Sequence, residues 1–341
     1  MSQKAADVEF ISAEIQGEVA LQEGNGASLF VSIDKDLVAK PGTNLDSWFL
    51  VANLESTRGT MYLLIHYLHV TPPTGGDGLM AVMVSLLDPQ TNKYIAEEQD
   101  FPGNQCSFDT EKFKVITPIA SASGTASGIN FKGNWSKAGI EVDITAQQTG
   151  PLLPNLGNGL FPALGGMTYH YALPTMSATG TVSIGGERYK VTGDAWLDRQ
   201  WGVVPRFFST ELKKWVWFGI TLDNGDRISV WEFIEAGRPV HSWATVVRPN
   251  GAVEVVSCEP LTANASKPWK SLETEHVYPI DWDIRIPQLD GHLIIRPDVI
   301  EQEFVSPAGM HKYEGFSAIT GTFRGKTVTG RVVIEMVADW L

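Results

Sequence analysis

Hydrophobic residues along the chain follow the short, alternating runs of β-strands, and no stretch keeps a helical period. Leu79 to Leu87 is an almost continuous apolar run that ends at Asp88-Pro89, which is typical of a strand covered on both faces. Another apolar run, Met61 to Val70, precedes it, and the breaker-rich segment Thr71 to Gly78 separates the two. The first half of the chain is therefore expected to form a core of its own.

Two tight turns predict hairpins in the middle of the chain. Gly185-Gly186 joins two strands, and Asp223-Asn-Gly225 separates two aromatic-rich strands between Lys214 and Phe233, because Asn and Gly tolerate the positive φ that such turns need. The segment from Pro151 to Gly166 is rich in Pro, Gly and Asn and is predicted to be a long loop. Further strands are expected over His241 to Val247, Ala252 to Cys258 and Tyr313 to Ala338.

The composition agrees with an antiparallel all-β protein. The 33 glycines and 19 prolines punctuate the strands at close spacing, which favours a sandwich or a barrel. Hydrophobic residues make up 43% and charged residues 19% of the chain, as in ordinary folded proteins. A length of 341 residues exceeds a typical single core, so we expect two domains, with one large β domain as the alternative.

The charge and the absence of targeting signals bear on partners and location. The net charge of −13 would repel nucleic acid and anionic membranes, so a neutral, apolar small molecule is the expected ligand. The first thirty residues lack the pattern of a signal peptide, and no run of eighteen apolar residues occurs. We expect a cytoplasmic monomer or homodimer, secreted only if a leader was removed. Cys106 and Cys258 are expected to be free thiols, with a single bridge between them as the alternative.

The strongest candidate for chemistry is Asp198, which lies between Trp196 and Trp201 in the segment Met167 to Val204. A carboxyl held against indole rings loses solvation of its charged form, which raises its pKa and suits it to general acid catalysis near neutral pH. Strand alternation puts Asp198 and Trp196 on one face. A structural ion pair with an arginine on a neighbouring strand is the alternative role for this carboxyl.

Aromatic residues on nearby strands are candidates for substrate binding. Trp215 and Trp217 share one strand face and could line a pocket for a flat or polyene ligand, with core packing as their alternative role. Tyr169 and Tyr171 share a face opposite His170, and a phenol that points into a pocket could orient a carbonyl or hydroxyl group.

Glu314 is the candidate for a second catalytic acid, because hydration needs an acid for the alkene and a base for the water. Capping of a turn is its alternative role, and its neighbour Tyr313 is expected to contact the substrate. His66 and His69 are three residues apart on a strand and face opposite sides, so no metal site is expected there. No nucleophile elbow, phosphate-cradling loop or dinucleotide fingerprint appears, which argues against the usual hydrolases, kinases and dehydrogenases.

Five segments carry motifs that occur together in one known family. They are Tyr169-His-Tyr171, the hairpin over 180–193, Ala195-Trp-Leu-Asp-Arg-Gln-Trp-Gly202, Trp215-Val-Trp-Phe218 with Asp223-Asn-Gly225, and Tyr313-Glu-Gly315. On these segments the chain, from Ser47 to its C-terminus, resembles the AttH/CrtC family of tandem lipocalin-like proteins. That family includes carotenoid 1,2-hydratase, kievitone hydratase-like enzymes and, more distantly, the fungal decalin-forming Diels-Alderases.

The resemblance implies two lipocalin-like antiparallel β-barrels, which we place at residues 1–190 and 191–341, with a ligand pocket between or within them and no metal or organic cofactor. Asp198 matches the family aspartate that is the proposed proton donor of the carotenoid hydratase. We therefore expect a cofactor-independent enzyme that hydrates or cyclises an unsaturated isoprenoid or polyketide, with Asp198 as the acid and tryptophan π faces stabilising the developing cation.

Two alternatives stay open at this stage. A Diels-Alderase would need no proton transfer and would hold one folded substrate conformer. A lipocalin-like carrier would bind a lipophilic ligand and leave it unchanged.

Overall fold

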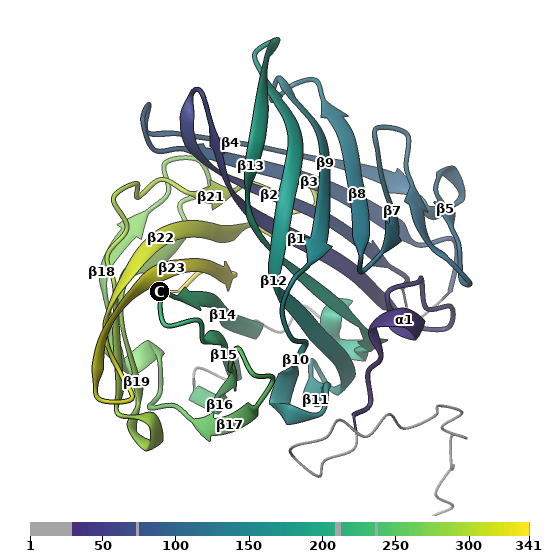
Figure 1. Ribbon diagram of the computed structural model, residues 1–341. Helices are drawn as coiled ribbons and strands as arrows, with labels where there is room; N and C mark the ends of the chain where they lie inside the picture. Colours follow the sequence, from purple (N-terminus) through teal and green to yellow (C-terminus); the bar gives the residue numbers. More distant parts are fainter. Residues whose placement is uncertain (1–28, 73–74, 209–212, 236–237, 341) are drawn as a thin grey trace, which may run out of the picture.

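The computed structural model describes residues 29–72, 75–208, 213–235 and 238–340, which form two antiparallel β-sheets (Figure 1). The predicted all-β fold is confirmed. Residues 1–28, which include most of the stretch that lacks a signal-peptide pattern, lie outside the described part of the chain. Within that part, the helices are α1 (Ile33–Asp36) and short 3-10 turns at η1 (Gly103–Gln105), η2 (Asn155–Gly157), η3 (Pro205–Phe208), η4 (Thr262–Asn264) and η5 (Pro287–Leu289). None of these described helices has the length and apolarity to span a membrane.

The larger sheet has the strand order β4-β3-β2-β1-β13-β12-β9-β8-β7-β6-β5, with β10 and β11 added beside β12. Neighbours in sequence mostly pair with each other, as expected for strands joined by short turns, and β13 lies in the middle of the sheet, where it pairs with both β1 and β12. Its strands are β1 (Leu45–Ser56), β2 (Gly59–Val70), β3 (Leu79–Asp88), β4 (Lys93–Pro102), β5 (Ser107–Phe108), β6 (Phe113–Ile116), β7 (Ala120–Thr125), β8 (Gly128–Trp135), β9 (Ile140–Gln148), β10 (Leu153–Pro154), β11 (Leu160–Ala163), β12 (Gly166–Ile184) and β13 (Glu187–Val203).

The smaller sheet has the order β17-β16-β15-β14-β23-β22-β20-β19-β18, with β21 beside β22. Its C-terminal strand β23 returns to the middle of the sheet and pairs with β14, the first strand of this sheet in the chain. Its strands are β14 (Lys213–Leu222), β15 (Arg227–Glu235), β16 (Arg238–Val247), β17 (Val253–Ser257), β18 (Ala265–Lys270), β19 (Val277–Ile286), β20 (Gly291–Ile295), β21 (Glu303–Phe304), β22 (Lys312–Phe323) and β23 (Lys326–Val337).

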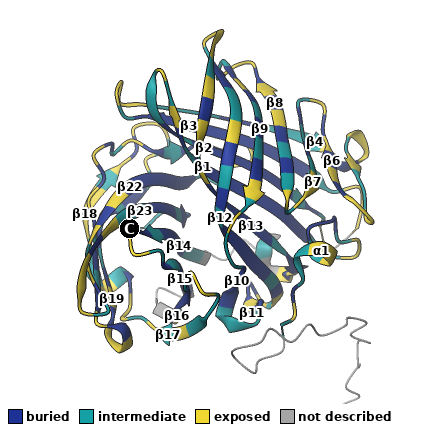
Figure 2. Ribbon diagram, in the orientation of Figure 1, coloured by how far each residue is buried: buried dark blue, intermediate teal, exposed yellow. Residues whose placement is uncertain are grey.

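Buried apolar side chains form three clusters, one inside each sheet and one between them (Figure 2). Strand β3 shows how: Met80, Val82 and Val84 pack inside the larger sheet, whereas Ala81 and Met83 belong to the cluster between the sheets. The prediction of a strand covered on both faces is therefore confirmed. The two cysteines are free thiols, as expected, and pack against the cores of different sheets.

The chain passes from the larger to the smaller sheet after β13. One segment that was predicted to be a loop contains regular secondary structure. The division predicted between residues 190 and 191 falls inside β13, all of which belongs to the larger sheet. The prediction of a long loop over Pro151 to Gly166 is wrong, because this segment contains β10, η2 and β11. Its apolar residues Leu153 and Phe161 are fully buried, and both short strands pair with β12.

Both predicted hairpins are present. Gly185 and Gly186 have φ of 58° and 88° in the turn between β12 and β13, and Gly225 has φ of 93° between β14 and β15. The first hairpin is irregular in one place: the pairing shifts between Leu173 and Met176, so that two residues of β12 oppose Trp196 alone. Such a β-bulge exchanges the two faces of a strand relative to its partner.

Arg199 is fully buried and ties β13 to the segment before β1. Its Nη1 lies 2.6 Å from a carboxylate oxygen of Asp46, and its guanidinium stacks against Trp48 and Trp201 with centroid distances of 4.3 and 4.9 Å. The guanidinium also donates to four backbone carbonyls, those of Asp36, Val38, Ser47 and Gln200. The arginine of the Leu-Asp-Arg motif is thus a structural residue.

Replacing Arg199 with Met is expected to lower the free energy of unfolding by about 3 to 5 kcal/mol, because Asp46 and several carbonyls lose a buried partner. Equilibrium urea unfolding, followed by tryptophan fluorescence, measures this change. The exposed Arg285, which lies 3.9 Å from Glu259, provides the matched control, and Arg285→Met should cost less than about 0.5 kcal/mol. Equal stability of the two variants would contradict a structural role for Arg199.

Candidate active site

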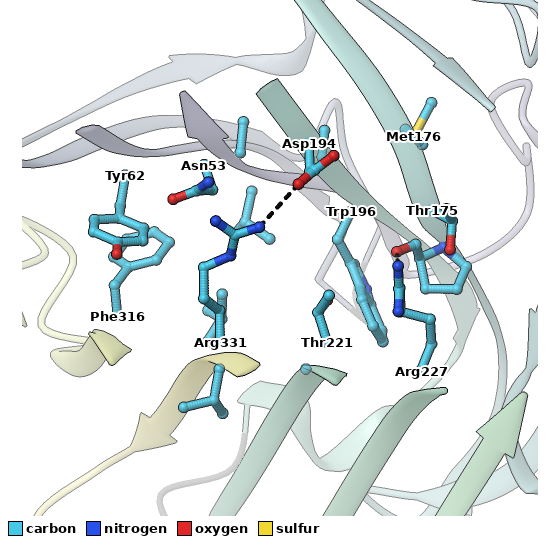
Figure 3. Close-up of a pocket in the computed structure, with 17 residues that line it drawn as sticks. Asn53, Tyr62, Thr175, Met176, Asp194, Trp196, Thr221, Arg227, Phe316 and Arg331 are labelled. Atoms are coloured by element: carbon cyan, nitrogen blue, oxygen red, sulfur yellow. Dashed lines mark hydrogen bonds and ion pairs between the residues drawn. The ribbon is translucent and has the colours of Figure 1, made fainter. Parts of the chain in front are cut away.

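A groove between the two sheets lies along β1, β13, β14 and β23 and holds two pockets, each lined by residues of both sheets. Its outer pocket, the outer chamber, spans about 570 Å³ of space that is partly open to solvent, and its lining includes Asn53, Tyr62, Trp196, Arg227, Phe316 and Arg331 (Figure 3). Its inner pocket, the inner chamber, spans about 310 Å³ of space that is partly open to solvent and is lined by Ser47, Phe49, His66, His170, Asp198, Gln200, Trp217, Trp231 and Glu335. The two chambers follow each other along the strands, with Trp196 and Asp198 two residues apart on β13.

Asp198 lies in the inner chamber with only 6% of its surface exposed. The indole Nε1 of Trp196 donates a hydrogen bond of 2.7 Å to Oδ1 of Asp198, and Nε2 of His170 lies 3.9 Å from Oδ2. Burial raises the pKa of Asp198 well above its ordinary range, although the Trp196 bond acts in the opposite direction. Burial therefore favours the neutral, protonated carboxyl. Among the described residues, Asp198 makes no ion pair with an arginine, the alternative role considered for it, and contacts Trp196 and His170.

The hydrogen bond from Trp196 also favours one oxygen of Asp198 as the carrier of the proton. Oδ1 accepts from the indole, so the acidic proton belongs on Oδ2, the oxygen nearer His170. The prediction that Trp196 and Asp198 share a strand face is confirmed, whereas Ala195, Leu197 and Trp201 pack inside the larger sheet.

Two buried histidines accompany Asp198. Desolvation lowers the pKa of His170 to about 3 and that of His66 well below its ordinary value, so both imidazoles are neutral near pH 7. The side-chain amide of Asn155 contacts Nδ1 of His170, and Nε2 of His66 lies 2.8 Å from Oγ of Ser47. Nδ1 of His66 is buried without a hydrogen-bond partner among the described residues. A neutral imidazole nitrogen in this state can bind a water molecule.

The smaller sheet supplies the opposite wall. The indole nitrogens of Trp217 and Trp231 both donate to Oγ of Ser229 at 3.0 Å, which fixes the two rings. The carboxylate of Glu335 accepts from Nε1 of Trp215 at 2.8 Å, and its charge adds to the rise in the pKa of Asp198. Trp217 therefore lines the inner chamber as predicted for a substrate-binding residue, while Trp215 positions Glu335.

Glu314 is fully buried next to the inner chamber but does not line it. It lies opposite Glu335 on the neighbouring strand, and its carboxyl is 2.5 Å from Nζ of Lys312. Burial raises the pKa of Glu314 to about 8, with Lys312 acting in the opposite direction. Glu335 therefore lies near both acids: it faces Glu314 on the neighbouring strand, and its charge raises the pKa of Asp198.

The three tyrosines singled out in the sequence pack into the sheet cores. Tyr169 stacks on Trp201 with ring centroids 5.1 Å apart, and Tyr171 is fully buried on the same face of β12. Tyr313 packs inside the smaller sheet, 5.7 Å from Tyr278. None of the three lines the inner or the outer chamber. His170, which lies between the first two, occupies the inner chamber in their place.

The β-bulge explains why sequence reasoning missed His170. In a hairpin without a bulge, the pairing that starts at Gly185-Gly186 would place Tyr171 opposite Gln200. Tyr171 would then lie on the same face as Asp198. The bulge shifts the pairing by one residue, so that His170 pairs with Gln200 and the tyrosines turn to the core. The proline at position 174 was the available signal, because proline within a strand marks a bulge or an edge.

A protein-family model described as AttH-like matches residues 27–338. The chain belongs to the AttH-like family. Kievitone hydratase of Fusarium solani subsp. phaseoli is 26% identical over 307 residues, which cover 86% of this chain and 83% of that protein.

Two solved structures share this fold over nearly their whole length. A protein assigned as AttH from Nitrosomonas europaea has a TM-score of 0.77 at 19% identity, covering 90% of this AttH-like chain and 96% of its own. Kievitone hydratase from Nectria haematococca has a TM-score of 0.76 at 22% identity, covering 89% and 92%. The predicted tandem lipocalin-like fold and family resemblance are confirmed.

The raised pKa of Asp198 makes stability depend on pH. Between the pKa of the unfolded chain and the higher pKa of the folded protein, only the folded state holds the proton, so stability falls as pH rises, by about 1.4 kcal/mol per unit. Asp198→Asn removes this loss and keeps an acceptor for Trp196. The variant should therefore exceed the wild type in stability at pH 7, with a smaller advantage at pH 5.

Urea unfolding at the two pH values measures this difference. Asp290→Asn is the matched control, because Asp290 is exposed in a turn with φ of 44°, which asparagine tolerates. A constant difference between wild type and Asp198→Asn at both pH values would contradict a protonated, buried carboxyl.

Proposed function

We propose that this AttH-like protein is a cofactor-independent enzyme that adds water across a carbon-carbon double bond of a hydrophobic metabolite. One observation carries the proposal: a buried carboxyl, favoured in its protonated form, has its free oxygen Oδ2 in a chamber walled by tryptophans and neutral histidines. The relationship to kievitone hydratase, named for the hydration of kievitone, supports the same reaction type.

Asp198 begins the reaction. Its Oδ2 proton passes to one alkene carbon, the π electrons form the new C–H bond, and the other carbon becomes a carbocation. The faces of Trp217 and Trp231 stabilise this cation, since an aromatic face attracts positive charge most strongly when water is excluded. Near Oδ2, His170 can donate from Nε2 to the new carboxylate, because its Nδ1 faces the Asn155 amide nitrogen.

Water completes the reaction. When Nε2 of His66 donates to Ser47, Nδ1 of His66 is an acceptor that can hold the water. The water oxygen bonds to the carbocation and its extra proton returns to the Asp198 carboxylate. The substrate gains one water molecule and the enzyme regains its acid, so no cofactor or external proton donor takes part.

Incubation in water enriched with oxygen-18, with kievitone as the first probe and other unsaturated phenols and terpenes after it, tests the reaction type. Hydration adds the mass of one labelled water to the product. A product of unchanged mass but new ring structure would identify a cyclase or Diels-Alderase, and return of every probe unchanged would favour a carrier.

Asp198→Asn is expected to lower kcat about 10³-fold, because the amide cannot give a proton to the alkene while its shape is kept. Steady-state kinetics on a probe that the wild type hydrates measures the effect, and Asp290→Asn should retain full activity. Near-normal kcat of the Asp198 variant would exclude this residue as the acid.

Glu335→Gln is expected to move the alkaline limb of the kcat/KM profile to lower pH. Activity requires protonated Asp198 and is lost as pH rises through its pKa. Without the charge of Glu335 that pKa is lower. Glutamine keeps an acceptor for Trp215. Glu141→Gln, an exposed change on β9, is the control, and a limb that stays in place or moves upward would refute the coupling.

A further inference from the structure

The outer chamber has a polar end that the hydration chemistry does not use. Figure 3 shows Asn53, Tyr62, Asp194 and Arg331 gathered at this end. The backbone explains the grouping, because Asn53 on β1 lies directly between Tyr62 of β2 and Asp194 of β13. Since these residues come from both sheets, folding builds a defined polar site at the groove.

Asn53 supplies an unsatisfied hydrogen-bonding group. Its Oδ1 atom is buried and has no hydrogen-bond partner among the described residues. Leaving such a group unpaired is unfavourable, so a ligand that bonds to it gains affinity. A side-chain amide offers a donor and an acceptor, which a hydroxyl group can match in either orientation.

Arg331 lies at the same end of the chamber and has N–H donors beyond the one that bonds to Asp194. Its Nη2 bonds to Oδ2 of Asp194 at 2.9 Å, and both side chains are largely accessible, at 40% and 71% exposure. Arg227, the other arginine of the chamber, is engaged by the backbone carbonyls of Pro174, Leu222 and Asp226. Arg331 is therefore the arginine that can turn a donor toward a ligand.

Aromatic and aliphatic side chains surround this polar end. Tyr62 and Phe316, one from each sheet, stack with ring centroids 5.4 Å apart and planes at 28°. Val51 and Val333 line the chamber beside them. A flat ring fits these walls, whereas a carboxylate would meet the charge of Asp194 next to Arg331.

We propose that this end of the outer chamber is a subsite for a hydroxyl-bearing aromatic ring of the substrate, whose hydroxyl bonds to Asn53 and Arg331. The identity of the bound molecule as a substrate rests on the proposed function. Asp194 and Asp198 are four residues apart on β13, roughly 13 Å along the strand. The substrate thus spans the two chambers past Trp196, with the ring outside and the double bond at Asp198.

Two unreactive probes, 4-pentylphenol and pentylbenzene, test the subsite because they differ only in the hydroxyl group. Isothermal titration calorimetry on the full-length protein should show about tenfold tighter binding of the phenol. Asn53→Ala and Arg331→Met should each reduce this ratio to about twofold, whereas the exposed control Arg285→Met leaves it unchanged. Equal binding of both probes by the wild type, or an unchanged ratio in both variants, overturns the subsite.

The two proposals can fail separately. Asp198→Asn should keep the tenfold preference for the phenol, because Asp198 lies outside the outer chamber. Loss of the preference in that variant would contradict a separate subsite. If Asp198→Asn keeps the preference and also remains active, the hydration mechanism fails while the subsite stands.

Discussion

Dehydration of one carboxyl by the contact between the two sheets is the constraint on which the site depends. Neither sheet alone would bury Asp198: its own strand offers Trp196, and the opposite wall comes from Trp217 and Trp231 of the smaller sheet. Separation of the sheets would return water to the carboxyl and lower its pKa toward the ordinary value. The acid is thus a property of the pair of sheets, which gives a physical reason for a tandem arrangement.

The two faces of β13 have different roles: one stabilises the fold and the other carries the proposed chemistry. Arg199 and Trp201 lie toward the core of the larger sheet, where the arginine joins Asp46 and several backbone carbonyls. Trp196 and Asp198 lie toward the groove. Because the two sets alternate, the network around Arg199 fixes the backbone of β13 and thereby the direction of the Asp198 side chain.

The polar groups of the groove differ between its two chambers. In the inner chamber, burial keeps His66 and His170 neutral and favours the protonated form of Asp198, while Glu335 at the wall accepts a hydrogen bond from Trp215. Arg331 and Asp194, which form an ion pair in the outer chamber, lie where water can reach them. An uncharged, apolar segment of a ligand can therefore enter the inner chamber at low cost, while a polar group is held at the mouth. Trp196 lines the outer chamber and bonds to the acid of the inner one.

The sequence by itself determined the all-β character, the two hairpins, and the shared face of Trp196 and Asp198, because period-two alternation and turn chemistry are local. It missed β10 and β11, whose apolar residues lie among glycines and prolines. Tertiary structure decided the rest of the site. The bulge opposite Trp196 exchanged the faces of β12, bringing His170 to Asp198 and turning Tyr169 and Tyr171 to the core. Residues distant in sequence, such as His66 and Glu335, reach the inner chamber only when β1, β13, β14 and β23 meet, and no local pattern encodes that meeting.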